Sequence, residues 1–186
     1  MSRKVLIAYG TRYGATEGTS EEIAKVLRGE GLDVRVVNAS KEKVKDISEY
    51  DLVIVGSGIR MAKWTGAAEK FLKKFQKALS SKKVAIFVSS AAQALIEYEK
   101  KNEEIEKARK QYLEDKATKY NLHPISMVIF GGVWDFNRMF FVLRKTLASF
   151  KPKIEEAGFT EIKPGLYDTR DWDSIRAWAK EIATKG

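Results

Sequence analysis

One segment of the sequence sets the architecture: Val5-Leu6-Ile7-Ala8-Tyr9-Gly10-Thr11-Arg12-Tyr13-Gly14-Ala15-Thr16. Its first part, from Lys4 to Tyr9, is an almost continuous apolar run, which predicts a strand buried on both faces of a parallel sheet. The run leads into a short loop of hydroxyl side chains, glycines and one arginine, and a helix is expected from about Thr16. A loop between a buried strand and the positive end of a helix is typical of a phosphate site.

The rest of the chain repeats this alternation of strand and helix. We expect further strands over 33–38, 50–56, 83–89 and 125–131, and helices over 16–30, 66–79 and 171–183. Five strands alternating with helices predict a doubly wound, parallel α/β sheet, and the right-handed crossover rule limits its strand orders. With three prolines and no Gly/Ser-rich linker, the 186 residues are expected to form one domain.

A charged segment, Glu97–Lys119, exceeds this minimal alternation. Its acidic and basic residues are balanced, and its apolar stripe is thin, so it predicts one long and mostly exposed helix. Three Glu/Lys pairs in the favourable i,i+4 orientation support a helix. These pairs are Glu97 with Lys101, Glu103 with Lys107, and Glu106 with Lys110.

A second extra segment, Phe136–Phe150, combines apolar and basic residues. Six apolar side chains fall on one face of a predicted helix: Phe136, Met139, Phe140, Leu143, Leu147 and Phe150. Basic residues surround them: Arg138, Arg144, Lys145, Lys151 and Lys153. Two interpretations stay open. The helix packs on the core, or it forms a basic amphipathic surface that contacts a membrane or a lipid-soluble partner.

Composition excludes several function classes. The net charge is +9, but lysines alternate with glutamates rather than forming a basic run, so nucleic acid is not an expected partner. The absence of cysteine excludes thiolate catalysis and iron–sulfur sites, and it suits a reducing cytoplasm. The only histidine, His123, precedes Pro124 in an expected loop, so we expect no metal site. The run Val5–Tyr9 is too short for a signal peptide or a membrane span.

Ligands of open α/β sheets bind outside the carboxyl ends of the strands, and four loops of this chain are expected there. Threonine hydroxyls and backbone N–H groups can donate to a phosphate, Gly14 permits close approach, and apolar side chains can cover a flat ring. The site therefore suits a monophosphate that carries a planar heterocycle. Its expected residues are Thr11, Arg12, Tyr13, Gly14, Ala15, Thr16, Ser57, Gly58, Ile59, Arg60, Trp64, Ser89, Ser90, Ala91, Ala92, Gly132 and Trp134.

Competing motifs are missing from the sequence. No Gly-x-x-x-x-Gly-Lys-Ser/Thr loop occurs, and Gly56-Ser57-Gly58 lacks the third glycine of a dinucleotide fingerprint. No Gly-x-Ser-x-Gly elbow is present, which argues against the common hydrolases. The acidic pair that a phosphoacceptor receiver needs after its first strand is absent from Tyr9–Arg12.

The first loop resembles the phosphate loop of the flavodoxin family, Thr/Ser-x-Thr-Gly-x-Thr. Thr11, Gly14 and Thr16 match this pattern, and Tyr13 replaces its middle threonine. The resemblance implies FMN as cofactor and a five-stranded sheet in the order 2-1-3-4-5, with FMN at the switch point.

A narrower resemblance is to the flavodoxin-like, quinone-dependent protoporphyrinogen IX dehydrogenases. It is carried by Ser57-Gly58-Ile59-Arg60, by the aromatic and basic insert from Trp134 to Lys145, and by Asp168–Trp172 with the helix that follows. It implies an FMN-dependent oxidoreductase that passes electrons from a porphyrinogen to a quinone, with helical insertions at about 97–119 and 134–153. We expect no catalytic side-chain acid or base. Arg60, Arg138 and Arg144 are candidates to receive substrate carboxylates or lipid phosphates.

Two other interpretations of the same residues stay open. The protein is a non-enzymatic, flavodoxin-type electron carrier that docks on a protein partner, or it is a flavodoxin fold without flavin that acts as an interaction module. For the enzyme, the expected location is the cytoplasm, with or without peripheral contact to the membrane through 136–153.

Overall fold

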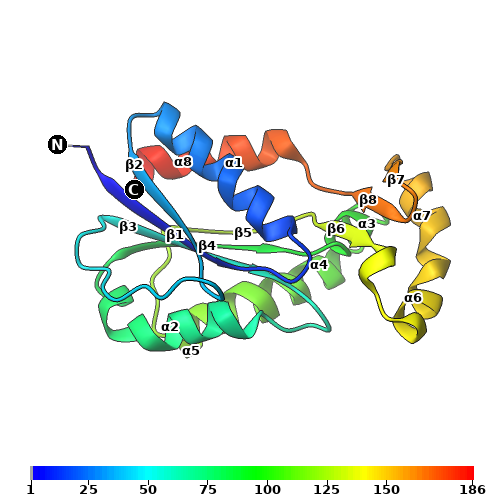
Figure 1. Ribbon diagram of the computed structural model, residues 1–186, viewed down its shortest axis with the longest axis horizontal. Coiled ribbons are helices and arrows are strands. Elements are labelled where there is room, and N and C mark those ends of the chain that lie inside the picture. Colours follow the sequence, from blue (N-terminus) through cyan, green and yellow to red (C-terminus); the bar gives the residue numbers. More distant parts are fainter. Residues whose placement is uncertain (1) are drawn as a thin grey trace.

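A five-stranded parallel sheet forms the centre of the computed structural model, which describes residues 2–186 (Figure 1). Its strands are β1 (Lys4–Gly10), β2 (Asp33–Asn38), β3 (Leu52–Gly58), β4 (Lys83–Ser89) and β5 (Ser126–Phe130). All neighbours pair in parallel, in the order β2-β1-β3-β4-β5. The predicted α/β class and strand order are therefore confirmed.

Helices cover both faces of this sheet. α1 (Ala15–Gly29) and α8 (Trp172–Lys185) lie on one face, and α2 (Gly66–Leu79) and α5 (Asp115–Lys119) lie on the other (Figure 1). Side chains of a strand alternate between faces, so Ile7 joins the core under α1 and α8 while Leu6 joins the core under α2. Both are fully buried, and each burial contributes about 1.5–3 kcal/mol. The apolar run after Lys4 is explained by this two-sided burial.

The last helix begins where its sequence predicts. Asp171 caps α8, and its carboxylate accepts hydrogen bonds from the N–H groups of Asp173 and Ser174 at 3.0 and 3.1 Å. The Ser174 hydroxyl donates to the same carboxylate at 2.6 Å. Hydrogen bonds from the Ser174 hydroxyl and backbone hold the pKa of Asp171 below its ordinary value.

The prediction of one long helix over Glu97–Lys119 is wrong. The segment divides into α3 (Gln93–Tyr98), α4 (Asn102–Arg109), the π-helix η1 (Lys110–Glu114) and α5. The break falls at Lys100, whose φ is 53°, and Lys101 pairs with Glu99 and Glu104 rather than Glu97. Each i,i+4 pair is worth only about 0.2–0.5 kcal/mol, whereas burying Leu113 against the core is worth several times more. Packing therefore decides the path of this segment.

The prediction of one helix over Phe136–Phe150 is also wrong. The segment forms the 3-10 turn η2 (Phe136–Arg138), then α6 (Phe141–Leu147) and η3 (Ala148–Phe150), and α7 (Lys151–Glu156) follows. Phe136 is 2% exposed while Phe140 is 61% exposed, so the two side chains do not share a buried face. Extended backbone at Met139 and Phe140 interrupts the helical path between them.

A small antiparallel sheet in this region has no counterpart in the sequence prediction. It contains β6 (Val133–Asp135), β8 (Leu166–Asp168) and β7 (Glu161–Lys163), in the order β6-β8-β7. Together with α6 and α7 it forms an end lobe, residues 133–168, at the right of Figure 1. The lobe has its own core, in which Trp134, Phe136 and Tyr167 are buried. Strands of three residues are too short to show a period of two.

Within residues 2–186, no helix has the length and apolar character needed to cross a lipid bilayer.

Candidate functional site

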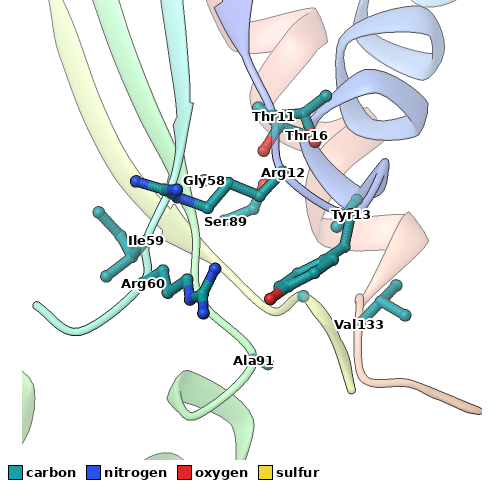
Figure 2. Close-up of a pocket in the computed structure, with 12 residues that line it drawn as sticks. Thr11, Arg12, Tyr13, Thr16, Gly58, Ile59, Arg60, Ser89, Ala91 and Val133 are labelled. Carbon is teal, nitrogen blue, oxygen red and sulfur yellow. The ribbon is translucent and has the colours of Figure 1, made fainter. Parts of the chain in front are cut away.

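Two adjoining cavities lie at the carboxyl edge of the parallel sheet. The first cavity, of about 50 Å³, is lined by Thr11, Arg12, Tyr13, Ala15, Thr16, Gly58, Ile59, Arg60, Ser89, Ala91, Gly132 and Val133 (Figure 2). The second cavity, of about 230 Å³, is lined by Tyr13, Ile59, Arg60, Met61, Ala62, Ser90, Ala91, Ala92, Tyr112, Val133, Trp134, Met139, Leu143 and Leu147. Five residues line both: Tyr13, Ile59, Arg60, Ala91 and Val133. The two cavities are thus parts of one site.

The loop after β1 presents the start of α1 to the first cavity. Gly14 is the N-cap residue and has a φ of 93°, a left-handed conformation that glycine adopts without strain. Its N–H donates to the Thr11 hydroxyl at 3.0 Å, which closes the loop. No side chain of the described chain caps α1 itself. The positive end of the helix dipole is therefore left for a ligand.

Two buried hydroxyl groups face this cavity without a hydrogen-bond partner among residues 2–186. They belong to Thr16, which is 1% exposed, and to Ser89, which is 4% exposed. An unpaired buried polar group costs about 1–3 kcal/mol, so such groups are rare in proteins unless a ligand or water satisfies them. Gly58 keeps the space above Thr16 open, because a Cβ at Gly58 would lie 3.1 Å from the Thr16 hydroxyl.

The electrostatic character of the site is positive. Arg12 and Arg60 approach the first cavity from the loops after β1 and β3 (Figure 2), and none of the described residues that line either cavity is acidic. The Arg60 guanidinium lies 5.8 Å from the centre of the Tyr13 ring. An anion can therefore bind here without repulsion from the lining side chains.

Residues from other parts of the fold also hold the phosphate-loop candidate, which is the loop from Thr11 to Thr16. Arg138 of the end lobe donates to the carbonyl oxygen of Tyr13 at 3.2 Å, and Arg170 donates to that of Ala15 at 3.1 Å. The Tyr9 hydroxyl donates to the Glu17 carboxylate at 2.9 Å, and burial together with this bond raises the pKa of Tyr9 to about 12. These contacts tie the loop and the first turn of α1 to β1, to the end lobe and to the segment before α8.

The structure brings most of the residues expected from the sequence to one site. Those that line a cavity are Thr11, Arg12, Tyr13, Ala15, Thr16, Gly58, Ile59, Arg60, Ser89, Ser90, Ala91, Ala92, Gly132 and Trp134. Gly14 is the N-cap of α1 and does not line either cavity. Ser57 and Trp64 do not line either cavity. Ser57 is fully buried and its hydroxyl accepts from the Thr65 N–H, while Trp64 is 3% exposed and donates to the Tyr112 carbonyl.

Part of the second cavity is lined by residues that the sequence did not indicate as site residues. Met139, Leu143 and Leu147 reach it from the end lobe, and Tyr112 reaches it from the π-helix η1. The apolar period of 136–150 indicated an apolar face, but it did not show whether that face packs on the core or lines a cavity. Tyr112 carried no signal, because a π-helix has no distinctive sequence pattern.

The flavodoxin domain is the family model that matches this chain, over residues 6–157. The protein belongs to the flavodoxin-domain family. This membership implies a flavin as cofactor. The chain is also 24% identical to protoporphyrinogen IX dehydrogenase [quinone] of Escherichia coli K12, over 97% of this chain and 94% of that protein.

Solved structures of other proteins share the fold. A flavodoxin from the domain Archaea superposes with a TM-score of 0.58 at 14% identity, over 98% of this chain and 97% of that one. Rubredoxin oxygen:oxidoreductase from Desulfovibrio gigas superposes with a TM-score of 0.57 at 14% identity, over 98% of this chain and 35% of that one. These two likenesses support the fold and leave the reaction to be argued from the site.

Proposed function

We propose that this flavodoxin domain binds FMN and acts as an oxidoreductase similar to quinone-dependent protoporphyrinogen IX dehydrogenase. The observation that carries the proposal is the buried Thr16 hydroxyl, unpartnered within residues 2–186, beside the uncapped start of α1 in a cavity without lining acids. A dianionic phosphate satisfies that hydroxyl, the first N–H groups of α1 and the charge of Arg12 together.

The residues present fit FMN and divide into two groups. Thr11, Thr16 and Arg12 would hold the phosphate, while Tyr13, Ala91 and Val133 would border the ring where the two cavities meet. When bound, FMN supplies two-electron redox chemistry at its ring. The chain supplies position, positive charge and exclusion of water, and no side-chain acid or base is assigned.

The second cavity favours an enzyme over a simple carrier. It adjoins the first, and Trp134, Met139 and Leu143 give it an apolar wall. An apolar space next to a flavin can hold the ring of an organic substrate or acceptor, a quinone or a porphyrinogen, whereas a carrier needs only an accessible flavin edge. Arg60 lines this space, and Arg138 and Arg144 lie on the end lobe as partners for substrate carboxylates.

An apolar tip on the end lobe supports peripheral contact with a membrane. Phe140, Phe141 and Val142 are consecutive and are 61%, 68% and 65% exposed. The segment 136–153 contains five basic residues and no acidic one. Exposed aromatic and aliphatic side chains beside cations suit an anionic lipid surface. A lipid-soluble quinone could then reach the second cavity, which the same helix α6 lines.

The first experiment is the absorption spectrum of the protein after reconstitution with FMN and removal of free flavin. Bound flavin is expected at micromolar concentration, and its absence would sink the proposal. Anaerobic assay with protoporphyrinogen and a menaquinone analogue follows. Turnover supports the enzyme, whereas FMN binding without turnover leaves the electron carrier.

The membrane contact has its own test. The double variant Phe140→Ser/Phe141→Ser should lose co-sedimentation with anionic phospholipid vesicles. Ile162→Ser is the matched control, because Ile162 is 60% exposed on β7, outside the tip. Equal sedimentation of both variants and the wild type would remove the tip from the proposal.

The alternative is a non-enzymatic electron carrier that docks on an acidic protein. It is favoured by exposed lysines of α2, such as Lys70, Lys73 and Lys77, which form no ion pair within the described chain. Charge reversal of these lysines should slow electron transfer to an acidic partner if the carrier is correct, and it should leave quinone reduction unchanged if the enzyme is correct.

A further inference from the structure

We infer that Arg60 makes this site favour reduced FMN, in its anionic form, over oxidised FMN. The inference rests on the proposed function, since it requires FMN in the first cavity. Arg60 would then set the direction in which the site shifts the midpoint potential of bound FMN.

The position of Arg60 is fixed by backbone contacts. The N–H of the preceding residue, Ile59, donates to the Ser89 carbonyl at 2.9 Å, which ties the loop after β3 to the end of β4. Arg60 and Lys63 then exchange both backbone hydrogen bonds, at 3.1 and 3.0 Å, across a two-residue turn. Hydrogen bonds to Ser89 and to Lys63 therefore fix the backbone from which the Arg60 side chain extends.

The backbone of that turn is strained, which indicates that the turn has a functional role. Its two central residues, Met61 and Ala62, have φ values of 49° and 58°, a conformation that glycine or asparagine usually supplies. The Met61 side chain is 79% exposed, so burial of that side chain does not repay the strain. Strained backbone persists where the surroundings over-determine it, and such positions cluster at functional sites. Here the turn aims Arg60 at both cavities.

The charge of Arg60 is not neutralised locally. Its Nε is buried and has no hydrogen-bond partner among residues 2–186, and Arg60 belongs to none of the ion pairs formed by these residues. An arginine keeps its proton at any pH a protein tolerates. Because none of the described residues that line the two cavities is acidic, a ligand would have to supply the counter-charge.

The phosphate of FMN would be held by Thr11, Thr16 and Arg12, so the charge available to Arg60 is the one that reduction adds to the ring. The ring of oxidised FMN is neutral, and a hydride from an organic donor adds two electrons and one proton, so the ring gains one negative charge while the donor is oxidised by two electrons. A positive charge in a partly buried site attracts this anion with little screening by salt. Reduced FMN is therefore bound more tightly than oxidised FMN. The reduced ring stays anionic, because Arg60 stabilises its charge without the uptake of a second proton.

Arg60 is a better candidate for this role than Arg12. Arg12 is exposed, lines only the first of the two cavities and belongs to the loop that would surround the phosphate. Arg60 lines both cavities and lies beside Tyr13 at their boundary, where the ring would lie (Figure 2).

The direct test uses the wild-type protein with FMN. The midpoint potential of bound FMN is compared with that of free FMN at the same pH, because the difference reports the ratio of the two dissociation constants. We expect reduced FMN to bind at least tenfold more tightly, which is a rise of about 30 mV for a two-electron couple. Tighter binding of oxidised FMN would overturn the inference while leaving FMN binding intact. Failure of FMN to bind at all would overturn the inference and the proposed function together.

Variants then locate the effect. Arg60→Gln should lower the midpoint potential by about 30 mV or more and raise the number of protons taken up with the two electrons near neutral pH. Arg60→Lys should retain most of the wild-type potential. Lys63→Gln is the matched control, since it removes one charge from the same turn at a residue that lines neither cavity. If FMN binds and Arg60→Gln matches Lys63→Gln in potential, Arg60 does not have this role.

Discussion

Replacement of Thr16 by valine should change the stability of the FMN-free protein and its affinity for FMN in opposite directions. Valine keeps the β-branched shape of threonine and removes only the hydroxyl, which is buried and unpaired within residues 2–186. In the ligand-free protein this removes an unsatisfied polar group, whose desolvation costs about 1–3 kcal/mol. Thr16→Val should therefore increase the free energy of unfolding of the FMN-free protein.

The same substitution should weaken FMN. A hydrogen bond to a charged group contributes about 1.5–3 kcal/mol, and 1.4 kcal/mol is a factor of ten in affinity. Loss of the hydrogen bond that the Thr16 hydroxyl would donate to the phosphate thus predicts roughly a 10- to 150-fold rise in the dissociation constant of FMN. Riboflavin, which lacks the phosphate, should bind the variant and the wild type equally.

Two measurements check this prediction. Urea unfolding of the FMN-free protein, followed by circular dichroism, gives the change in stability, and quenching of flavin fluorescence gives the dissociation constants. Thr19→Val is the control, because Thr19 lies one turn further along α1, is fully buried and already donates to the Ala15 carbonyl at 3.1 Å. If Thr16→Val binds FMN as well as Thr19→Val does, the phosphate does not lie against Thr16 and the reasoning is refuted.

Three further predictions concern the frame around the site. Tyr9→Phe should cost about 1.5 kcal/mol, through loss of the bond to Glu17. Because burial and this bond raise the Tyr9 pKa from 10.0 to about 12, the wild type should lose stability as pH rises from 10 to 12, and the variant should lose less in alkaline unfolding experiments. Asp171→Ala should cost about 1 kcal/mol by removing the cap of α8. The Asp171 pKa is lowered, so this contribution is present above 3.8 and disappears as pH falls through the lower folded value, which acid denaturation measures. Gly132→Ala should cost about 1–3 kcal/mol in thermal unfolding, because its Cβ would lie 2.8 Å from the Ala91 nitrogen; Gly29→Ala, with no atom within 4 Å, should not destabilise.

Local patterns accounted for the sheet and for the phosphate-loop candidate. The apolar runs around Ile7, Ile54 and Ile86 are buried on both faces, and continuous burial leaves a continuous apolar pattern that is legible in one dimension. The loop from Thr11 to Thr16 was predictable for a similar reason. Its hydroxyls, its glycine and the helix that follows are adjacent in the chain, so the chemistry and the geometry share one segment.

Trp64 shows where local reasoning stops. It follows Arg60 in the same loop, and the sequence placed both at the site, yet Arg60 lines the cavities while Trp64 is buried against the π-helix η1. The turn at Met61 and Ala62 reverses the chain between them, and its left-handed residues carry no sequence signal. A two-residue reversal of the chain therefore determines which side chain lines the cavities.

The sequence by itself determined the α/β class, the loop from Thr11 to Thr16 that is proposed to bind phosphate, and the basic, aromatic character of 136–153, because each depends on residues that are neighbours in the chain. Only the tertiary structure decided how 97–119 and 136–150 break, how the end lobe folds, and that Met139, Leu143 and Tyr112 share a cavity with Arg60. These outcomes depend on contacts between distant segments, whose burial is worth more than the local preferences of either. The strand–loop–helix segment thus indicates the cofactor, and the long-range contacts form the space beside it in which the reaction is proposed to occur.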